Sequence, residues 1–162
     1  MRKHTLITLL SIVYLCSGCL GKLINPDKLI GGSMSCTVNG QPWEASEASG
    51  LRLFGSVSLT GVKGSGKNTS TLLLAFDQDK AKAGTTIDLN ATASSLGSSL
   101  TSYAATVNGV EGNYLPTEGK IKITAASGSK IEGTFSLKGE DISGKNKAVT
   151  IENGKFSINL LL

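Results

Sequence analysis

Apolar and polar residues alternate with a period of two through most of this 162-residue chain. The clearest example is KIEGTFSLK, residues 130–138, where Ile131, Phe135 and Leu137 fall on one face of an extended strand. A strand whose two faces differ in this way is half buried. The same alternation recurs at 56–60, 86–90, 103–107 and 120–125. No comparable helical stripe accompanies it, so the sequence predicts an all-β protein.

Three Asn-Gly pairs mark the places where strands are expected to turn. They stand at 39–40, 108–109 and 153–154. This dipeptide tolerates the positive φ angles of a two-residue hairpin turn. A turn at the first pair places Cys36 opposite Trp43, where we expect the core to begin, and a turn at the third pairs Ile151 with Phe156. The middle pair is ambiguous, because the residues after it fit a loop as well as a strand.

The number and spacing of the strands indicate the architecture. Residues 71–76, TLLLAF, are apolar on both faces, which is typical of a central strand between two layers. Residues 90–102 are small and of low complexity, so we expect a loop or a poorly formed edge strand there. About eight to ten antiparallel strands predict a β-sandwich, with a closed β-barrel as the alternative. We expect them to form one domain over residues 34–162.

The first residues have the form of an export signal. A short basic head at 1–4 precedes TLITLLSIVYL at 5–15, an apolar run too short to span a bilayer as a mature helix. The run ends in CSGC, which resembles the lipobox of bacterial lipoproteins, with Cys19 as the lipidated residue and 1–18 as the signal peptide. Cys16 stands where that motif usually has Leu, so secretion without lipidation is the alternative.

The lipobox resemblance implies a protein held at a membrane surface by the acyl chains on Cys19, at about 0.8 kcal/mol per buried methylene. Leu20 follows the cysteine in place of Asp, which by analogy favours the outer membrane, with the domain facing the periplasm or the surface. Residues 19–33 would then form the anchor and its tether. Cys36 would be the one remaining thiol, so we expect no internal disulfide.

Composition argues against several kinds of chemistry. The single histidine, His4, lies in the leader, and its removal takes away Ser-His-Asp and Cys-His nucleophile systems and the commonest zinc ligand. Without the leader the net charge is 14 − 12, or +2, and the lysines are scattered singly. We therefore expect no nucleic-acid partner, and no cofactor.

Residues 61–68, GVKGSGKN, are one residue away from the phosphate-binding motif G-x-x-x-x-G-K-[ST]. Asn68 stands where that motif needs a hydroxyl for Mg²⁺, and 70–77 continues as a strand where the motif needs the start of a helix. We predict a glycine-rich hairpin loop with 56–62 and 70–76 as its arms, and no nucleotide binding.

A few side chains are weak candidates for a site. Asp77 and Asp79 lie two residues apart at a strand end, where two carboxylates could form half of a Ca²⁺ site or a hydrolytic pair, although a solvated strand end explains them as well. Asp88 and the pair 140–141 are expected at ordinary surface positions. Trp43 and Tyr103 belong to the core by register, which leaves Tyr114 as the exposed aromatic residue that could contact a ligand.

Four segments in fixed order resemble the small Bacteroidetes lipoproteins of unknown function. They are MSCTVNGQPWEA at 34–45, KAGTTIDL at 82–89, GKIKIT with IEGTFSL between 119 and 137, and VTIENGKFSINL at 149–160. The resemblance implies an all-β domain on a lipid anchor, with no catalytic residues to transfer. We expect a non-enzymatic binding or structural module of the cell envelope, whose partner is an envelope protein or a glycan. The alternatives are a barrel or sandwich with a small-ligand cavity, and a glycan hydrolase built on Asp77 and Asp79.

Overall fold

The computed structural model describes residues 31–89, 101–107 and 109–161. The predicted signal segment, Cys19 and most of the predicted tether lie outside the described residues. Asn108 and residues 90–100 of the predicted loop also lie outside them.

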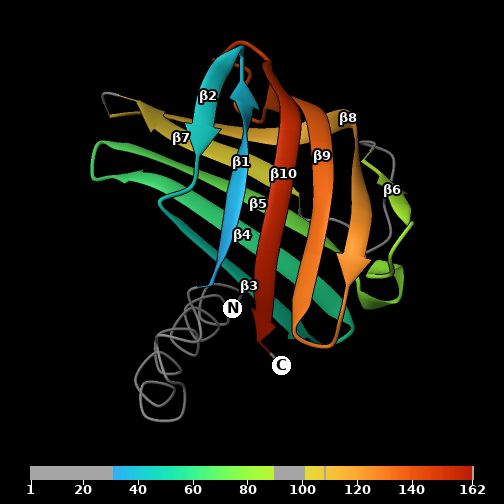
Figure 1. Cartoon of the computed structure of the whole chain (residues 1–162). Coiled ribbons are helices and arrows are strands. Elements are labelled where there is room, and N and C mark those ends of the chain that lie inside the picture. The colour runs from blue at the N-terminus through green and yellow to red at the C-terminus, as the bar shows by residue number, and fades with distance from the viewer. Residues whose placement is uncertain (1–30, 90–100, 108, 162) are drawn as a thin grey trace, which may run out of the picture.

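The described part of the chain consists almost entirely of strands (Figure 1). In chain order the elements are β1 (Gly32–Val38), β2 (Gln41–Glu44), β3 (Glu47–Leu53), β4 (Ser56–Ser65), β5 (Asn68–Asp77), the 3-10 turn η2 (Gln78–Lys80), β6 (Thr86–Asp88), β7 (Ser102–Val107), β8 (Val110–Ala126), β9 (Lys130–Asp141) and β10 (Val149–Leu161). The predicted all-β class is confirmed.

Seven strands close into a barrel in the order β3-β4-β5-β7-β8-β9-β10. The closing ladder between β10 and β3 is parallel and short, because it joins only Leu160 with Gly50 and Leu161 with Leu51. The remaining strands extend the sheet, since β1 pairs with β10, β2 with β1, and β6 with β8. The barrel is the predicted alternative to the sandwich, and it contains one parallel ladder that the prediction did not include.

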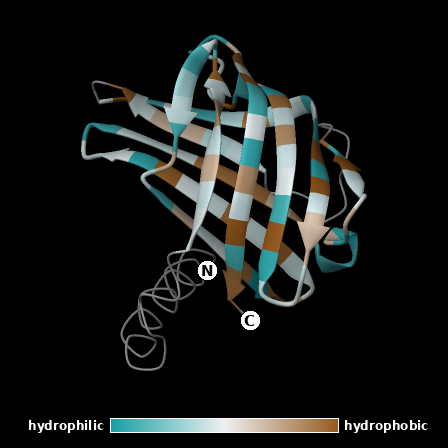
Figure 2. Cartoon of the chain, viewed as in Figure 1, coloured by the Kyte–Doolittle hydropathy of each residue, from teal (hydrophilic) through white to brown (hydrophobic). Residues whose placement is uncertain are grey.

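Inward-facing side chains fill the barrel, as the alternation predicts. Ile131, Phe135 and Leu137 of β9 are at most 3% exposed. Trp43 and Tyr103 are also buried, at 4% and 7% exposure. Figure 2 shows the result as hydrophobic and hydrophilic bands that alternate along the strands. Each fully buried large apolar side chain contributes about 1.5–3 kcal/mol of transfer free energy to this core.

Two of the predicted hairpins are confirmed. At the first Asn-Gly pair, Asn39 and Gly40 have φ of 49° and 77°, and Cys36 lies opposite Trp43. The segment that resembles a phosphate-binding loop joins β4 to β5 by a turn at 66–67, with Ser65 opposite Asn68. Residues 68–77 are a strand between β4 and β7, so this stretch lacks the helix N-terminus that holds a phosphate.

The hairpin predicted at Asn153-Gly154 is wrong. β10 runs through this pair from Val149 to Leu161, and Asn153, with φ of 55°, shifts the register against β9 between Ile151 and Gly154. This is a β-bulge in which Asn153 adopts a positive φ angle that residues in tight turns also adopt. Gly154 lies opposite Phe135, where a Cβ atom would come within 2.5 Å of the ring. The third Asn-Gly pair therefore bends a long strand and does not reverse it.

Candidate functional site

A broad groove of about 1040 Å³ crosses the sheet over β2, β1, β10, β9, β8 and β6. Most of its lining side chains come from the outward-facing positions of these strands. Cross-strand partners form a continuous row along it, made up of Thr86, Lys122, Thr134, Lys155, Ser35 and Glu44. Lys120 and Ser136 lie opposite each other, two residues along β8 and β9 from Lys122 and Thr134. We call this surface the outer groove.

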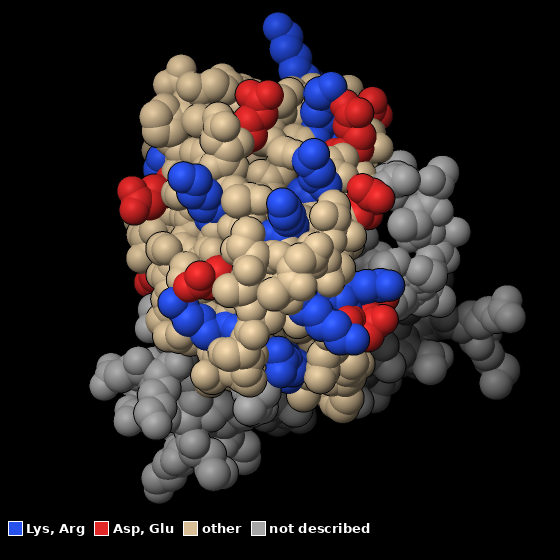
Figure 3. All heavy atoms as spheres, turned by 45° about the vertical axis from the view of Figure 1, so that its right-hand side comes forward, with Lys and Arg blue, Asp and Glu red and all other residues tan. Residues whose placement is uncertain are grey.

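Basic side chains dominate the charge of the outer groove. Lys63, Lys120, Lys122 and Lys155 line it together with one acidic residue, Glu44. The Lys63 ammonium donates a hydrogen bond to the carbonyl oxygen of Pro42 at 3.2 Å. The other three lysines form no ion pair or side-chain hydrogen bond with any described residue. Figure 3 shows single basic side chains standing apart from acidic ones near the middle of the face that carries β8 and β9.

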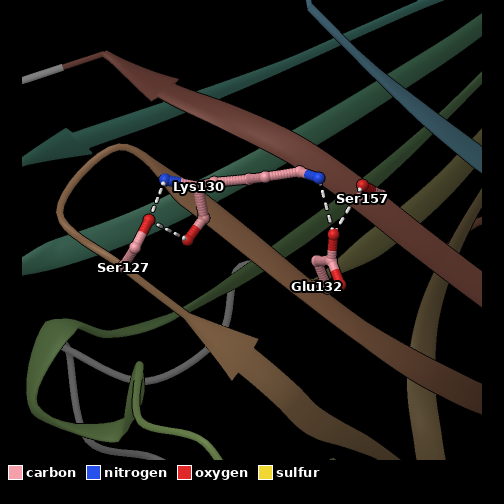
Figure 4. A network of polar contacts seen from close by, with 4 residues as sticks. All are labelled: Ser127, Lys130, Glu132 and Ser157. Atoms are coloured by element: carbon pink, nitrogen blue, oxygen red, sulfur yellow. Dashed lines mark hydrogen bonds and ion pairs between the residues drawn. The ribbon is translucent and has the colours of Figure 1, made fainter.

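Lysines of β9 outside the outer groove have acidic partners. Lys130 Nζ lies 2.6 Å from Glu132 Oε1, and the Ser157 hydroxyl donates to the same oxygen at 3.2 Å (Figure 4). The hydrogen bond from Lys130 holds the pKa of Glu132 below its usual value, with Ser157 adding to the effect. Lys138 pairs with Glu118, which raises the pKa of Lys138. The cations of the outer groove therefore differ from their neighbours in lacking a carboxylate.

The spacing of these cations suits an extended anionic ligand. Lys122 and Lys155 are two strands apart, or about 10 Å at 4.7–4.9 Å per strand. Lys120 lies two residues from Lys122, roughly 7 Å along the same strand. The hydroxyls of Thr134 and Ser136 lie between them. Ammonium groups and hydroxyls together donate hydrogen bonds to phosphate, sulfate or carboxylate oxygens.

Tyr114, the predicted ligand contact, lies outside the outer groove. Its ring is half buried against the core, and its centroid is 5.8 Å from that of Tyr103. Burial raises the pKa of Tyr114, and the nearby Asp141 carboxylate raises it further. Both tyrosines line a separate hollow of about 500 Å³. A ligand contact at Tyr114 stays a prediction.

Asp77 and Asp79 lie at and just after the end of β5, and a site built on these two carboxylates stays a prediction. Asp77 ends β5, and Asp79 lies in η2 with its carboxylate 3.8 Å from Lys80 Nζ. Among the residues that the structure describes, no three His, Cys, Asp or Glu side chains come together in a way that could hold a metal ion.

Asp141 is not the ordinary surface residue that the sequence indicated. It ends β9 at 8% exposure, and its carboxylate accepts hydrogen bonds from the backbone N–H groups of Asn113, Lys145 and Asn146 and from the Ser143 hydroxyl. The Ser143 hydrogen bond and these backbone donors hold the pKa of Asp141 far below its usual value, against the opposing effect of burial. Asp141 therefore organises the loop after β9, a role that only the fold reveals.

The thiol of Cys36 is buried, as the sequence predicted. Burial raises its pKa to about 11, and the charge of Lys63 offsets part of that rise. The thiol is therefore protonated at neutral pH and poorly nucleophilic.

Within the described ranges, no helix has both the length and the apolar character needed to cross a membrane. The comparison with curated proteins found no match, and neither did the comparison with solved structures. A family profile does match, over residues 32–158, which include almost every strand of the barrel. The chain belongs to the family described as Domain of unknown function (DUF6252).

Proposed function

We propose that this protein is a lipid-anchored, non-enzymatic binding module of the cell envelope, whose outer groove binds an anionic glycan. The observation that carries the proposal is the set of lysines without carboxylate partners, Lys120, Lys122 and Lys155, in a groove that five Ser and Thr side chains also line. The anchor is supported by the lipobox resemblance at Cys19, which also favours the outer membrane.

A repeating anion suits the outer groove better than a single small anion. Each exposed ion pair contributes only about 0.2–1 kcal/mol, because water and salt screen the charges. Three such contacts sum to roughly 1–3 kcal/mol, so useful affinity requires a ligand that meets several lysines at once. A glycan that carries phosphate, sulfate or carboxylate groups along its length meets this condition, and its hydroxyls match Thr134 and Ser136.

The test compares binding of the full chain to dextran sulfate and to neutral dextran. We expect binding to the sulfated polymer alone, with an affinity that falls as salt is added. The variant Lys122→Gln with Lys155→Gln should weaken binding about tenfold, because two contacts of about 0.7 kcal/mol are lost.

The matched control replaces two exposed lysines outside the outer groove, Lys67→Gln with Lys147→Gln, and keeps the same net charge as the groove variant. It should bind like the unaltered chain. Equal weakening in both variants would mean that the polymer responds to the overall charge of the protein. An absence of binding to the sulfated polymer would refute the proposal that the outer groove binds an anionic glycan. Mass spectrometry of Cys19 tests the anchor separately, since an unmodified thiol there would contradict it.

A further inference from the structure

The turn between β3 and β4 exposes an unusual amount of apolar surface for its size. Phe54 is 95% exposed, and Leu51 and Leu53 on the outward face of β3 are 44% and 49% exposed. We call these three residues the apolar tip. Isolated exposed apolar residues are ordinary, but three adjacent ones that include a free aromatic ring mark a contact surface.

The backbone at Phe54 is strained, which argues against a role for its ring in stabilising the fold. Phe54 and Gly55 form the two-residue turn that closes the Leu53–Ser56 pair, and both have positive φ, 50° and 78°. Asn and Gly are the residues that favour such a turn, whereas a bulky side chain at positive φ is a strained exception. A strained residue whose side chain packs against nothing points to a role outside the fold.

The apolar tip lies at the end of the barrel where the tether arrives. Leu161 at the end of β10 pairs with Leu51, and the Asn159 N–H donates to the Gly31 carbonyl oxygen at 2.7 Å. Figure 1 shows the start of β1 and the end of β10 near each other at this lower end of the barrel. The first described residue and the apolar tip therefore share one end of the molecule.

The length of chain between the predicted anchor and the barrel keeps this end close to the membrane. Gly31 follows Cys19 by 31 − 19, or 12, positions. Fully extended this connection would span about 40 Å, and as a coil roughly 20 Å. A domain held on so short a connection has its tether end near the lipid surface for most of the time.

We infer that the apolar tip inserts into the lipid surface to which Cys19 holds the domain. This inference rests on the anchor in the proposed function. Apolar side chains at a membrane surface lie about 5–10 Å deep, at the boundary between headgroups and acyl chains. A hairpin turn brings its aromatic ring to this depth while the strands behind it stay in water. The apolar tip would thus orient the domain, which the tether alone leaves free to rotate.

The test uses the Phe54→Trp variant of the full chain, anchored in vesicles that contain brominated phospholipids. We expect the emission of the introduced indole to shift to shorter wavelength and to be quenched by the bromine atoms. The native Trp43 is 4% exposed inside the barrel and supplies a constant background.

The matched control is Val110→Trp. Val110 is 63% exposed beside the β7–β8 turn, at the opposite end of the barrel from the apolar tip. Its emission should not be quenched. Unquenched added emission from anchored Phe54→Trp protein would overturn the inference. If that emission were also blue-shifted, a second copy of the chain would cover the apolar tip in place of lipid. Protein that stays in the supernatant with an unmodified Cys19 would instead contradict the anchor, and the inference with it.

Discussion

Replacing Phe54 with Asn is expected to stabilise the fold, although it removes an aromatic side chain. An L-residue in the left-handed region costs about 1–2 kcal/mol, and Asn escapes much of that cost because it tolerates this conformation. The ring contributes little in return, since it is 95% exposed. Of the 150–250 Å² that a buried aromatic side chain hides, about 10 Å² is hidden here, worth roughly 0.3 kcal/mol. The net gain is about 0.5–1.5 kcal/mol.

Urea denaturation of the unaltered chain and of Phe54→Asn measures this gain. The midpoint should rise at an unchanged slope, because the surface exposed on unfolding is nearly the same. Phe54→Ala serves as the control, since it removes the ring without relieving the backbone, and it should not raise the midpoint. A fall in stability of Phe54→Asn would show that the ring packs against the fold, and the argument for a contact surface at the apolar tip would lose its basis.

Two further substitutions test the core and the loop after β9. Phe135→Ala should destabilise the domain by about 3–5 kcal/mol, because Phe135 is 3% exposed, stacks 6.3 Å from Phe156 and covers Gly154. A urea midpoint that corresponds to a loss of less than about 1 kcal/mol in the free energy of unfolding would contradict this packing. Asp141→Asn should lower the melting temperature at neutral pH. The folded-state pKa of Asp141 is depressed, so its contribution is present above about pH 4 and is lost as the pH falls below that value. Melting curves from neutral to acidic pH should therefore converge for the two proteins, and parallel curves would refute the role of the charge.

Local turn chemistry predicted some hairpin turns of the fold correctly and one wrongly. Asn39-Gly40 and Asn153-Gly154 satisfy the same rule, because each puts Asn at positive φ. The first reverses the chain, but the second lies inside β10, where both β1 and β9 pair with the residues on either side of it. A bulge and a turn can both hold Asn at positive φ, and only the long-range pairing of the flanking strands decides between them.

The choice between barrel and sandwich also depends on pairing that periodicity does not encode. Alternation shows which residues face inward but not which strand each one joins. Closure here depends on the two-residue parallel ladder at Leu160 and Leu161, at the end of a strand that β1 already covers along most of its length. Nothing in the residues of β3 indicates that this strand is the partner of β10.

The outer groove could not be predicted from sequence spacing. Lys122 and Lys155 are 155 − 122, or 33, positions apart and occur singly, so their charges look dispersed. Register brings them into one row, because Thr134 lies opposite both lysines across β9. The exposure of the lysines was predictable from alternation, but their convergence needed the shifted register that the bulge in β10 produces.

The outer groove and the apolar tip together limit how a ligand can lie. Ser35, in the row that crosses the groove, lies opposite Lys155, which is 161 − 155, or 6, residues from Leu161, the partner of Leu51 in the apolar tip. The row is therefore about 20 Å from the tip along β10. With that tip in the lipid surface, the outer groove opens sideways above the headgroups, and its row of hydroxyls and lysines crosses the strands that rise from the membrane. A charged polymer lying along the membrane would meet that row lengthwise, whereas one projecting outward would cross it at a single lysine.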